Sequence, residues 1–152
     1  MYPGISQRKK PVTPLPQDSR RLEHPDCRRL LVAVGTAKYP HLPVRQLSRV
    51  PDEISQVVKA LVPFQYAHCL ADLCDNPHST HLCDRIPRWL QQDVRKGDLV
   101  VFYCSGHGAR EGDQFYLLTC NSEELLFAST AVSAEQLARW VTPAGKASQV
   151  LV

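Results

Sequence analysis

The sequence lacks any apolar run that approaches the roughly eighteen residues needed to span a membrane. Its N-terminus also lacks the apolar core that is typical of a secretory signal. Without such a signal, the six cysteines indicate reduced thiols rather than a disulfide framework. We therefore expect a cytoplasmic protein that has no membrane partner.

A strong excess of either charge is missing as well. The formal net charge is +3, and the first 26 residues hold five basic groups against three acidic ones. The remainder is close to neutral, so no nucleic-acid partner is expected. The hydrophobic fraction of 43% is ordinary for a chain that can build a core.

Residues 1–27 differ in composition from the rest of the chain. They hold five of the twelve prolines, the basic run Arg8-Lys9-Lys10 and few apolar residues. This composition predicts a disordered tail. The basic run either binds an acidic partner or is simply solvated, and such short runs favour the second interpretation. Residues 28–152 are then expected to form one domain.

Within that domain, short apolar runs alternate with amphipathic segments. The alternation predicts an α/β fold whose parallel sheet carries helices on both faces. The expected strands are residues 30–34, 66–70, 99–103 and 149–152, and helices are expected to begin at residues 51, 77 and 133.

Smaller signals refine this scheme. Asn76 is predicted to cap the second helix, with Pro77 at its first position. Ser133 and Gln136 have the spacing of a capping box. The run Phe115–Thr119 is predicted to pair with Leu125–Phe127 as a small hairpin at the rim of the sheet.

The most informative stretch is Asp98–Gly108, which reads DLVVFYCSGHG. The run Leu99–Tyr103 is typical of a strand buried on both faces in the middle of a parallel sheet. His107 then follows, between two glycines, at the carboxyl end of this strand, where reacting groups collect in open α/β sheets. A histidine there suits general base catalysis. The alternative is an incidental histidine in a tight turn.

These features resemble the large-subunit region of caspase-like cysteine peptidases, especially the bacterial caspase-like and metacaspase branch. The resemblance rests on the first strand to Gly35, the segment Leu47–Asp52 and, above all, the run Val100–Gly108. It covers residues 28–152. It implies a three-layer α/β/α sandwich with a mainly parallel sheet, incomplete at its C-terminal end.

The resemblance also implies roles for particular residues. His107 would be the general base of a cysteine endopeptidase, and the backbone N–H of Gly108 would help to form the oxyanion hole. Asp52 matches an acid that, in some members, lines a pocket for a basic substrate side chain; the simpler interpretation is an acid stabilised by the helix dipole. Calcium binding would accompany a metacaspase-like chain, although no acidic ligand run indicates it. Otherwise no cofactor is expected.

The nucleophile of this family lies after the next parallel strand, about 50 residues beyond the histidine. Only 45 residues follow His107 here, so the cysteine is expected just beyond Val152 or on a second chain that completes the site. Cys104 is expected in the core, Cys120 at the end of the rim strand and Cys27 near the tail, so none of these three replaces it.

A zinc site is the other use that the cysteines suggest. Its candidate ligands are Cys69, Cys74, His78, His81 and Cys83. They contain no C-x-x-C pair and cross a strand, a loop and a helix start, so no metal site is predicted.

Two functional interpretations follow. The first is a cysteine-type endopeptidase domain acting on peptide or protein substrates, inactive without its thiol. The second is a non-catalytic caspase-like binding module or truncated pseudo-peptidase. In either case, the far edge of the central strand is expected to be largely unpaired, which favours aggregation of the isolated chain.

Overall fold

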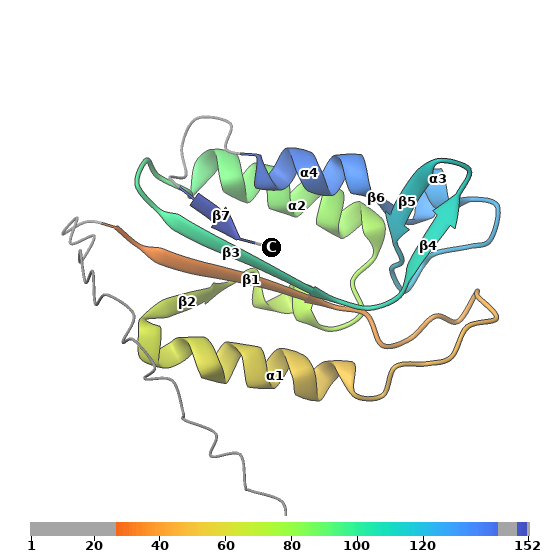
Figure 1. The fold of residues 1–152 in the computed structure, drawn as a ribbon, viewed down its shortest axis with the longest axis horizontal. Helices are drawn as coiled ribbons and strands as arrows, with labels where there is room; N and C mark the ends of the chain where they lie inside the picture. Colours follow the sequence, from red (N-terminus) through yellow and green to blue (C-terminus); the bar gives the residue numbers. More distant parts are fainter. Residues whose placement is uncertain (1–26, 143–148, 152) are drawn as a thin grey trace, which may run out of the picture.

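The computed structural model describes residues 27–142 and 149–151, and the predicted tail therefore lies almost wholly outside the described residues. The fold is mixed α/β, as the sequence predicted. Its main sheet has four parallel strands in the order β2-β1-β3-β7 (Figure 1). These strands are β1 (Arg29–Gly35), β2 (Tyr66–Cys69), β3 (Leu99–Ser105) and β7 (Gln149–Leu151).

Helices lie on both faces of this sheet. On one face lies α1 (Val50–Leu61), and on the other lie α2 (Ser79–Gln92) and α4 (Ala134–Val141) (Figure 1). Two short 3-10 helices, η1 (Val62–Phe64) and η2 (Ala71–Cys74), flank β2 along the chain. No helix among the described residues has both the length and the apolar character that a membrane crossing requires.

The strands supply apolar side chains to both faces because successive residues point in opposite directions. Leu31 and Ala33 of β1 pack with Val50 and Ile54 of α1. The other face buries a larger cluster, formed by Leu30, Val32, Val34, Val100 and Phe102 of the sheet with Leu82, Ile86 and Trp89 of α2. In β3 the burial is unequal, because Val101 and Tyr103 on the α1 side are only half-buried.

Helix ends follow local chemistry in most places. Pro51 lies in the first turn of α1, where a missing N–H costs no hydrogen bond. The capping box at α4 is confirmed: Gln136 donates its backbone N–H to Ser133 Oγ at 3.2 Å, and Ser133 donates its own to Gln136 Oε1 at 2.8 Å. Pro87 lies inside α2, which nevertheless runs without a break.

The predicted cap at Asn76 is wrong. The N-cap of α2 is His78, and Asn76 has a positive φ of 51°. The Asn76 side-chain oxygen accepts the backbone N–H groups of Ala37 and Lys38, each at 2.8 Å. Asn76 therefore stabilises the loop after β1 instead of the helix. This contact joins segments that are distant in sequence.

The predicted rim hairpin is half correct. The strand β5 (Gln114–Leu117) exists, but its partners are β4 (Gly108–Glu111) and β6 (Val132–Ser133). Leu125 and Leu126 instead precede a short helix, α3 (Phe127–Thr130). The turn between β4 and β5 has two residues and begins at Gly112, whose φ is +59°. Tight two-residue hairpin turns need such a positive φ, which glycine adopts readily, so Gly112 favours the pairing of β4 with β5.

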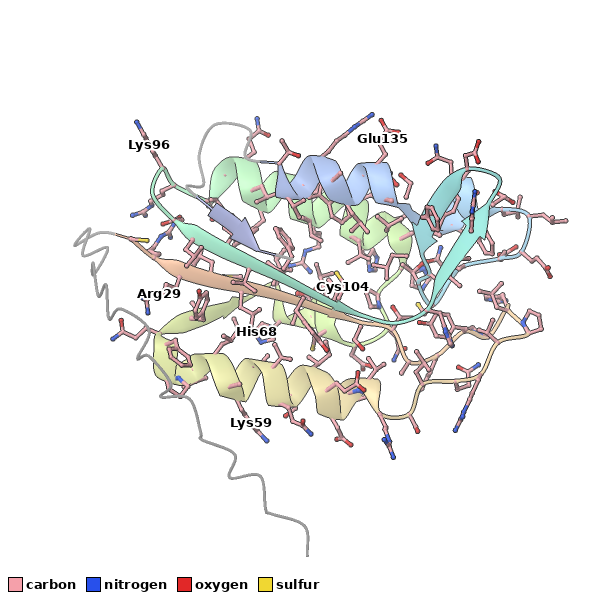
Figure 2. The ribbon with its side chains drawn as sticks, viewed as in Figure 1. Arg29, Lys59, His68, Lys96, Cys104 and Glu135 are labelled. Atoms are coloured by element: carbon pink, nitrogen blue, oxygen red, sulfur yellow. The ribbon has the colours of Figure 1, made fainter. Side chains whose placement is uncertain are left out.

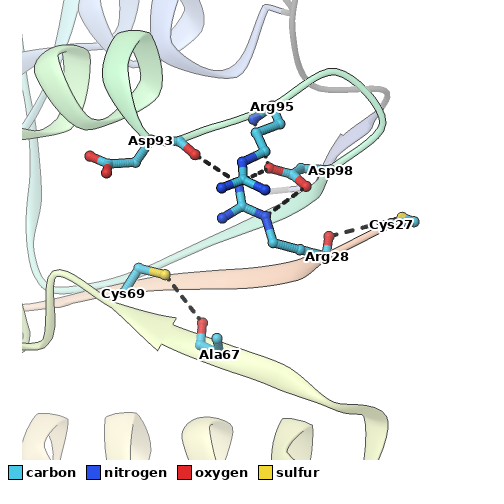
Figure 3. A network of polar contacts seen from close by, with 7 residues as sticks. All are labelled: Cys27, Arg28, Ala67, Cys69, Asp93, Arg95 and Asp98. Atoms are coloured by element: carbon cyan, nitrogen blue, oxygen red, sulfur yellow. Dashed lines mark hydrogen bonds and ion pairs between the residues drawn. The ribbon is translucent and has the colours of Figure 1, made fainter. Parts of the chain in front are cut away.

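A buried carboxylate connects the start of β3 to the start of β1 (Figure 3). Asp98 is 1% exposed. Its Oδ2 accepts bonds from Arg28 Nη2 at 2.5 Å and from the Arg95 backbone N–H at 2.7 Å. Arg28 also donates to the Asp93 carbonyl at 2.7 Å, so one guanidinium joins the first strand to the loop that follows α2.

His68 on β2 should make the stability of the fold depend on pH. It pairs in register with Leu31 and lies on the α1 side of the sheet (Figure 2), and its Nε2 is enclosed without a hydrogen-bond partner. Burial lowers the pKa of His68 below its ordinary value of 6.5. The unfolded chain therefore binds the proton more readily, and the free energy of unfolding should fall as the pH drops below about 6.5.

Urea unfolding at pH 7 and pH 5 measures this effect. His68→Leu should remove most of the fall in stability, because a leucine has no proton to gain. His41→Ala, at an exposed histidine in the loop after β1, serves as the control and should leave the fall in place. An unchanged pH dependence in His68→Leu would contradict the interpretation.

Candidate active site

The carboxyl ends of β1 and β3 lie side by side and carry the candidate site. The two strands pair along their whole length, to Gly35 opposite Ser105. Just beyond, Thr36 donates its backbone N–H to the Ser105 carbonyl at 2.9 Å. The loop after β1 and the turn at His107 therefore leave the sheet together, at the edge where α/β proteins place their ligands (Figure 1).

Tyr39 holds the His107 turn against that loop. This side chain is 1% exposed. Its hydroxyl accepts the backbone N–H of His107 at 2.7 Å and donates to the Thr36 carbonyl at 2.8 Å. Burial raises the pKa of Tyr39, and the bond from His107 offsets this only in part, so the phenol keeps the proton that it donates. Sequence reasoning did not identify Tyr39, since its contact spans 68 residues.

The ring of His107 is oriented by a backbone carbonyl. Its Nε2 lies 2.7 Å from the Arg45 carbonyl oxygen, and its ring centroid lies 5.0 Å from that of Tyr39. Because a carbonyl can only accept, Nε2 must carry a proton. In the neutral ring the lone pair is then on Nδ1, which is the arrangement that a general base needs.

Gly108 offers a backbone donor next to this ring. Leu118 donates its N–H to the His107 carbonyl at 2.9 Å, so these two residues form a hydrogen-bonded pair. Bonded and non-bonded pairs alternate along an antiparallel ladder, and Gly108 is opposite Leu117. The Gly108 N–H therefore points away from β5, and the residue is exposed.

A cleft of about 490 Å³ opens beside the turn. Its walls are the segment 45–50, Glu53, Ser105 and Gly106. Ser105 Oγ donates to Glu53 Oε2 at 2.8 Å, which fixes one carboxylate in the cleft. Asp52, the acid proposed from the resemblance, lies exposed in the first turn of α1 and is not among the lining residues. Its neighbour Glu53 is the acid that the fold brings to the site.

Four of the described cysteines lie in surroundings that do not favour a reactive thiolate. Cys104 packs against the large cluster on the α2 side of β3 (Figure 2), and burial raises its pKa to about 11. Burial likewise raises the pKa of Cys69, Cys83 and Cys120. Thiolates are therefore disfavoured at these positions. The predicted core placement of Cys104 agrees with these contacts.

No metal centre emerges from the described part of the chain. Within residues 27–142 and 149–151, no three histidine, cysteine or acidic side chains are grouped closely enough to hold an ion. His78 and His81 do approach each other, with ring centroids 5.5 Å apart, but a third such ligand does not join them. Calcium binding stays an expectation from the resemblance alone.

In comparisons with known proteins, the chain matches no family model and no curated protein.

The fit between Gly106 and Tyr39 provides a test of the site's architecture. A Cβ on Gly106 would lie 2.8 Å from the Tyr39 hydroxyl oxygen. Gly106→Ala should therefore lower the free energy of unfolding by about 1–3 kcal/mol. Tyr39→Phe should cost about 1–3 kcal/mol, since it leaves the His107 N–H and the Thr36 carbonyl without partners.

The double variant should lose less free energy of unfolding than the two single variants lose together, because removal of the Tyr39 hydroxyl makes room for the new methyl group. Urea unfolding of all four proteins gives this coupling. Gly108→Ala is the packing control, since its Cβ would meet its nearest atom at an ordinary 3.5 Å. If the two losses of stability simply add, residue 106 and the Tyr39 hydroxyl are not in contact.

Proposed function

We propose that this chain is the histidine-bearing part of a caspase-like cysteine endopeptidase. The observation that carries the proposal is the setting of His107. Its ring is oriented by the Arg45 carbonyl, and the N–H of the next residue, Gly108, points away from β5, at the carboxyl end of a central strand. The helices on both faces of the sheet are consistent with the three-layer α/β/α sandwich of that family.

The proposed reaction uses each group in turn. Nδ1 of His107 takes the proton of a cysteine thiol, and the thiolate attacks the scissile carbonyl of a bound peptide. The Arg45 carbonyl then stabilises the imidazolium, since it accepts a hydrogen bond from Nε2–H throughout. The Gly108 N–H stabilises the oxyanion of the tetrahedral intermediate. The ring next protonates the leaving amine, and water hydrolyses the acyl-enzyme.

The thiol comes, in this proposal, from a polypeptide segment outside the 152 residues. Either residues encoded after Val152 or a second chain would bring it to Nδ1. The described cysteines are poor alternatives, because burial disfavours the thiolate of most of them. The cleft formed by residues 45–50 and Glu53 would hold the substrate side chain that precedes the scissile bond.

A paired peptidase assay tests the proposal. One form is the 152-residue chain, and the other is the protein with any residues that its gene encodes after Val152. Fluorogenic peptides ending in arginine, lysine or aspartate are offered to both, with and without calcium. Hydrolysis by the longer form alone, abolished by a thiol-alkylating reagent, supports the proposal. No hydrolysis by either folded form contradicts it.

A non-catalytic caspase-like module is the second candidate. The observation that favours it is the absence, among the described residues, of any cysteine hydrogen-bonded to the His107 ring. In that case the same cleft binds a peptide without cleaving it. Binding of an uncleaved peptide by the longer form, at equal affinity in wild type and His107→Ala, would favour this candidate.

A further inference from the structure

Among the described residues, the strand β4 has a hydrogen-bonded neighbour on one side only. In the smaller sheet the strand order is β4-β5-β6, so β4 is an outer strand. It begins at Gly108, immediately after His107, and Gly108, Arg110 and Glu111 are exposed. In the described chain, the residues that directly follow the candidate general base therefore form a free sheet edge.

The hydrogen-bond pattern shows which backbone groups face that edge. Leu118 donates its N–H to the His107 carbonyl at 2.9 Å, so these two residues form a bonded pair of the ladder. Bonded and non-bonded pairs alternate along antiparallel strands. Gly108 and Arg110 therefore occupy non-bonded pairs, and their N–H and C=O groups point away from β5. Both residues thus offer a donor and an acceptor to the free edge.

A hollow of about 540 Å³ lies beside the same residues. Leu117 and Phe115 form part of its wall, and they are the residues opposite Gly108 and Arg110 in the ladder. The Arg110 side chain is held over the β4–β5 turn, because its Nε donates to the Gly112 carbonyl at 2.8 Å and its guanidinium carbon lies 5.3 Å from the centroid of the Phe115 ring. The hollow therefore offers space for side chains of a segment that lies along β4.

The cleft on the other side of His107 sets the direction of such a segment. Ser105 and Gly106 line that cleft, where the proposed function places the residue that precedes the scissile bond. The scissile carbonyl then lies at the Gly108 N–H. The residues after the scissile bond continue away from Gly106 and toward Glu111, which is the direction of β4 itself. A bound substrate would therefore run parallel to β4.

We propose that the free edge of β4 binds the segment after the scissile bond of an extended peptide substrate, as an added parallel strand. This inference rests on the proposed function, because the oxyanion contact at Gly108 is the first hydrogen bond of the added strand. The second residue after the scissile bond donates its N–H to the Gly108 carbonyl and accepts the N–H of Arg110, and the fourth donates to the Arg110 carbonyl. The side chains of the first and third residues lie on the same face as the hollow. The substrate class is therefore a polypeptide that is extended for about four residues after the scissile bond.

A capped tetrapeptide, acetyl-Leu-Ala-Ala-Ala-amide, carries every group that the proposal uses, since its acetyl carbonyl takes the place of the scissile carbonyl. It is titrated into the 152-residue chain, and the amide resonances of Gly108 and Arg110 are followed by NMR. Both amide protons should shift and exchange more slowly with solvent, because each gains an acceptor. The amide of Ala109, which faces β5, is the internal reference.

Two methylated forms of the tetrapeptide give the matched comparison. N-methylation of its second residue removes the N–H that would bond to the Gly108 carbonyl, whereas N-methylation of its third removes one that points away from β4. The first change should weaken binding about tenfold, and the second no more than about twofold. Equal binding of the two methylated peptides, or no shift at Gly108 and Arg110, would overturn the proposal. Shifts of these resonances with the concentration of the peptide-free chain would overturn it too, because a second copy would then occupy the edge.

The peptidase assay on the longer form separates this inference from the proposed function. Tetrapeptide binding at β4 without any peptide hydrolysis supports the added strand and contradicts the catalytic role of the chain. Hydrolysis of a fluorogenic peptide that has no residues after the scissile bond, together with no tetrapeptide binding, leaves the catalytic role in place and overturns the added strand.

Discussion

Replacing His107 by alanine is expected to lower peptide hydrolysis by the longer form of the protein about 10²–10⁴-fold. In the proposed reaction the ring takes the thiol proton on Nδ1 and returns it to the leaving amine. Its orientation does not depend on the substrate, since the Arg45 carbonyl holds Nε2 at 2.7 Å in the free protein. The value of kcat/KM for the most active fluorogenic peptide measures the loss.

His107→Gln separates base catalysis from structure. A glutamine side-chain amide can donate to the Arg45 carbonyl as Nε2 does, but it cannot accept a proton. We expect an equal loss of activity with unfolding midpoints close to those of the wild type. His81→Ala, at a histidine in the first turn of α2, is the matched control and should retain activity. Activity retained in His107→Gln would show that His107 is a structural residue.

The two inner strands of the sheet, β1 and β3, could be predicted from sequence because each is a dense apolar run. Buried parallel strands need no alternation, and the stretches at residues 30–34 and 99–103 show none. The position of His107 at the end of a strand followed from the same pattern. Local rules were equally successful for the start of α4, where the Ser133 capping box involves residues only three apart.

The partners of His107 could not be predicted in this way. Tyr39 and the Arg45 carbonyl reach it across 68 and 62 residues, through the conformation of one irregular loop. That loop depends in turn on Asn76, whose side-chain oxygen binds two of its backbone N–H groups. An asparagine before a proline is a good helix cap by local chemistry, so the tertiary contact overrode the local preference.

The choice between Asp52 and Glu53 likewise depends on a tertiary contact that local sequence rules do not predict. Both acids lie in the first turn of α1, and the helix dipole stabilises either one. Adjacent helical residues point about 100° apart, so only one of them can face Ser105. The structure selects Glu53, through the hydrogen bond from Ser105 Oγ. Sequence spacing alone does not give the rotation of α1 against the end of β3.

Asp98→Asn is expected to lower the free energy of unfolding by about 2–3 kcal/mol. The substitution keeps the shape of the side chain but removes the charge that accepts two bonds from Arg28 and one from the Arg95 backbone. The amide group would also turn a donor toward the guanidinium. Asp84→Asn is the matched control, since its ion pair with Arg88 is exposed and should contribute less than about 1 kcal/mol.

The same residue should control stability in acid. Burial alone would raise the pKa of Asp98, but the bonds from Arg28 and Arg95 and the charge of Arg28 together lower it below 3.8. A carboxyl that is more acidic when folded stabilises the protein above its unfolded pKa of about 3.9 and loses that contribution as the pH falls below it. Urea unfolding at pH 7 and pH 3 should therefore show a smaller difference for Asp98→Asn than for Asp84→Asn. Equal differences would mean that the charge on Asp98, in the buried ion pair at the start of β3, contributes no net stability to the fold.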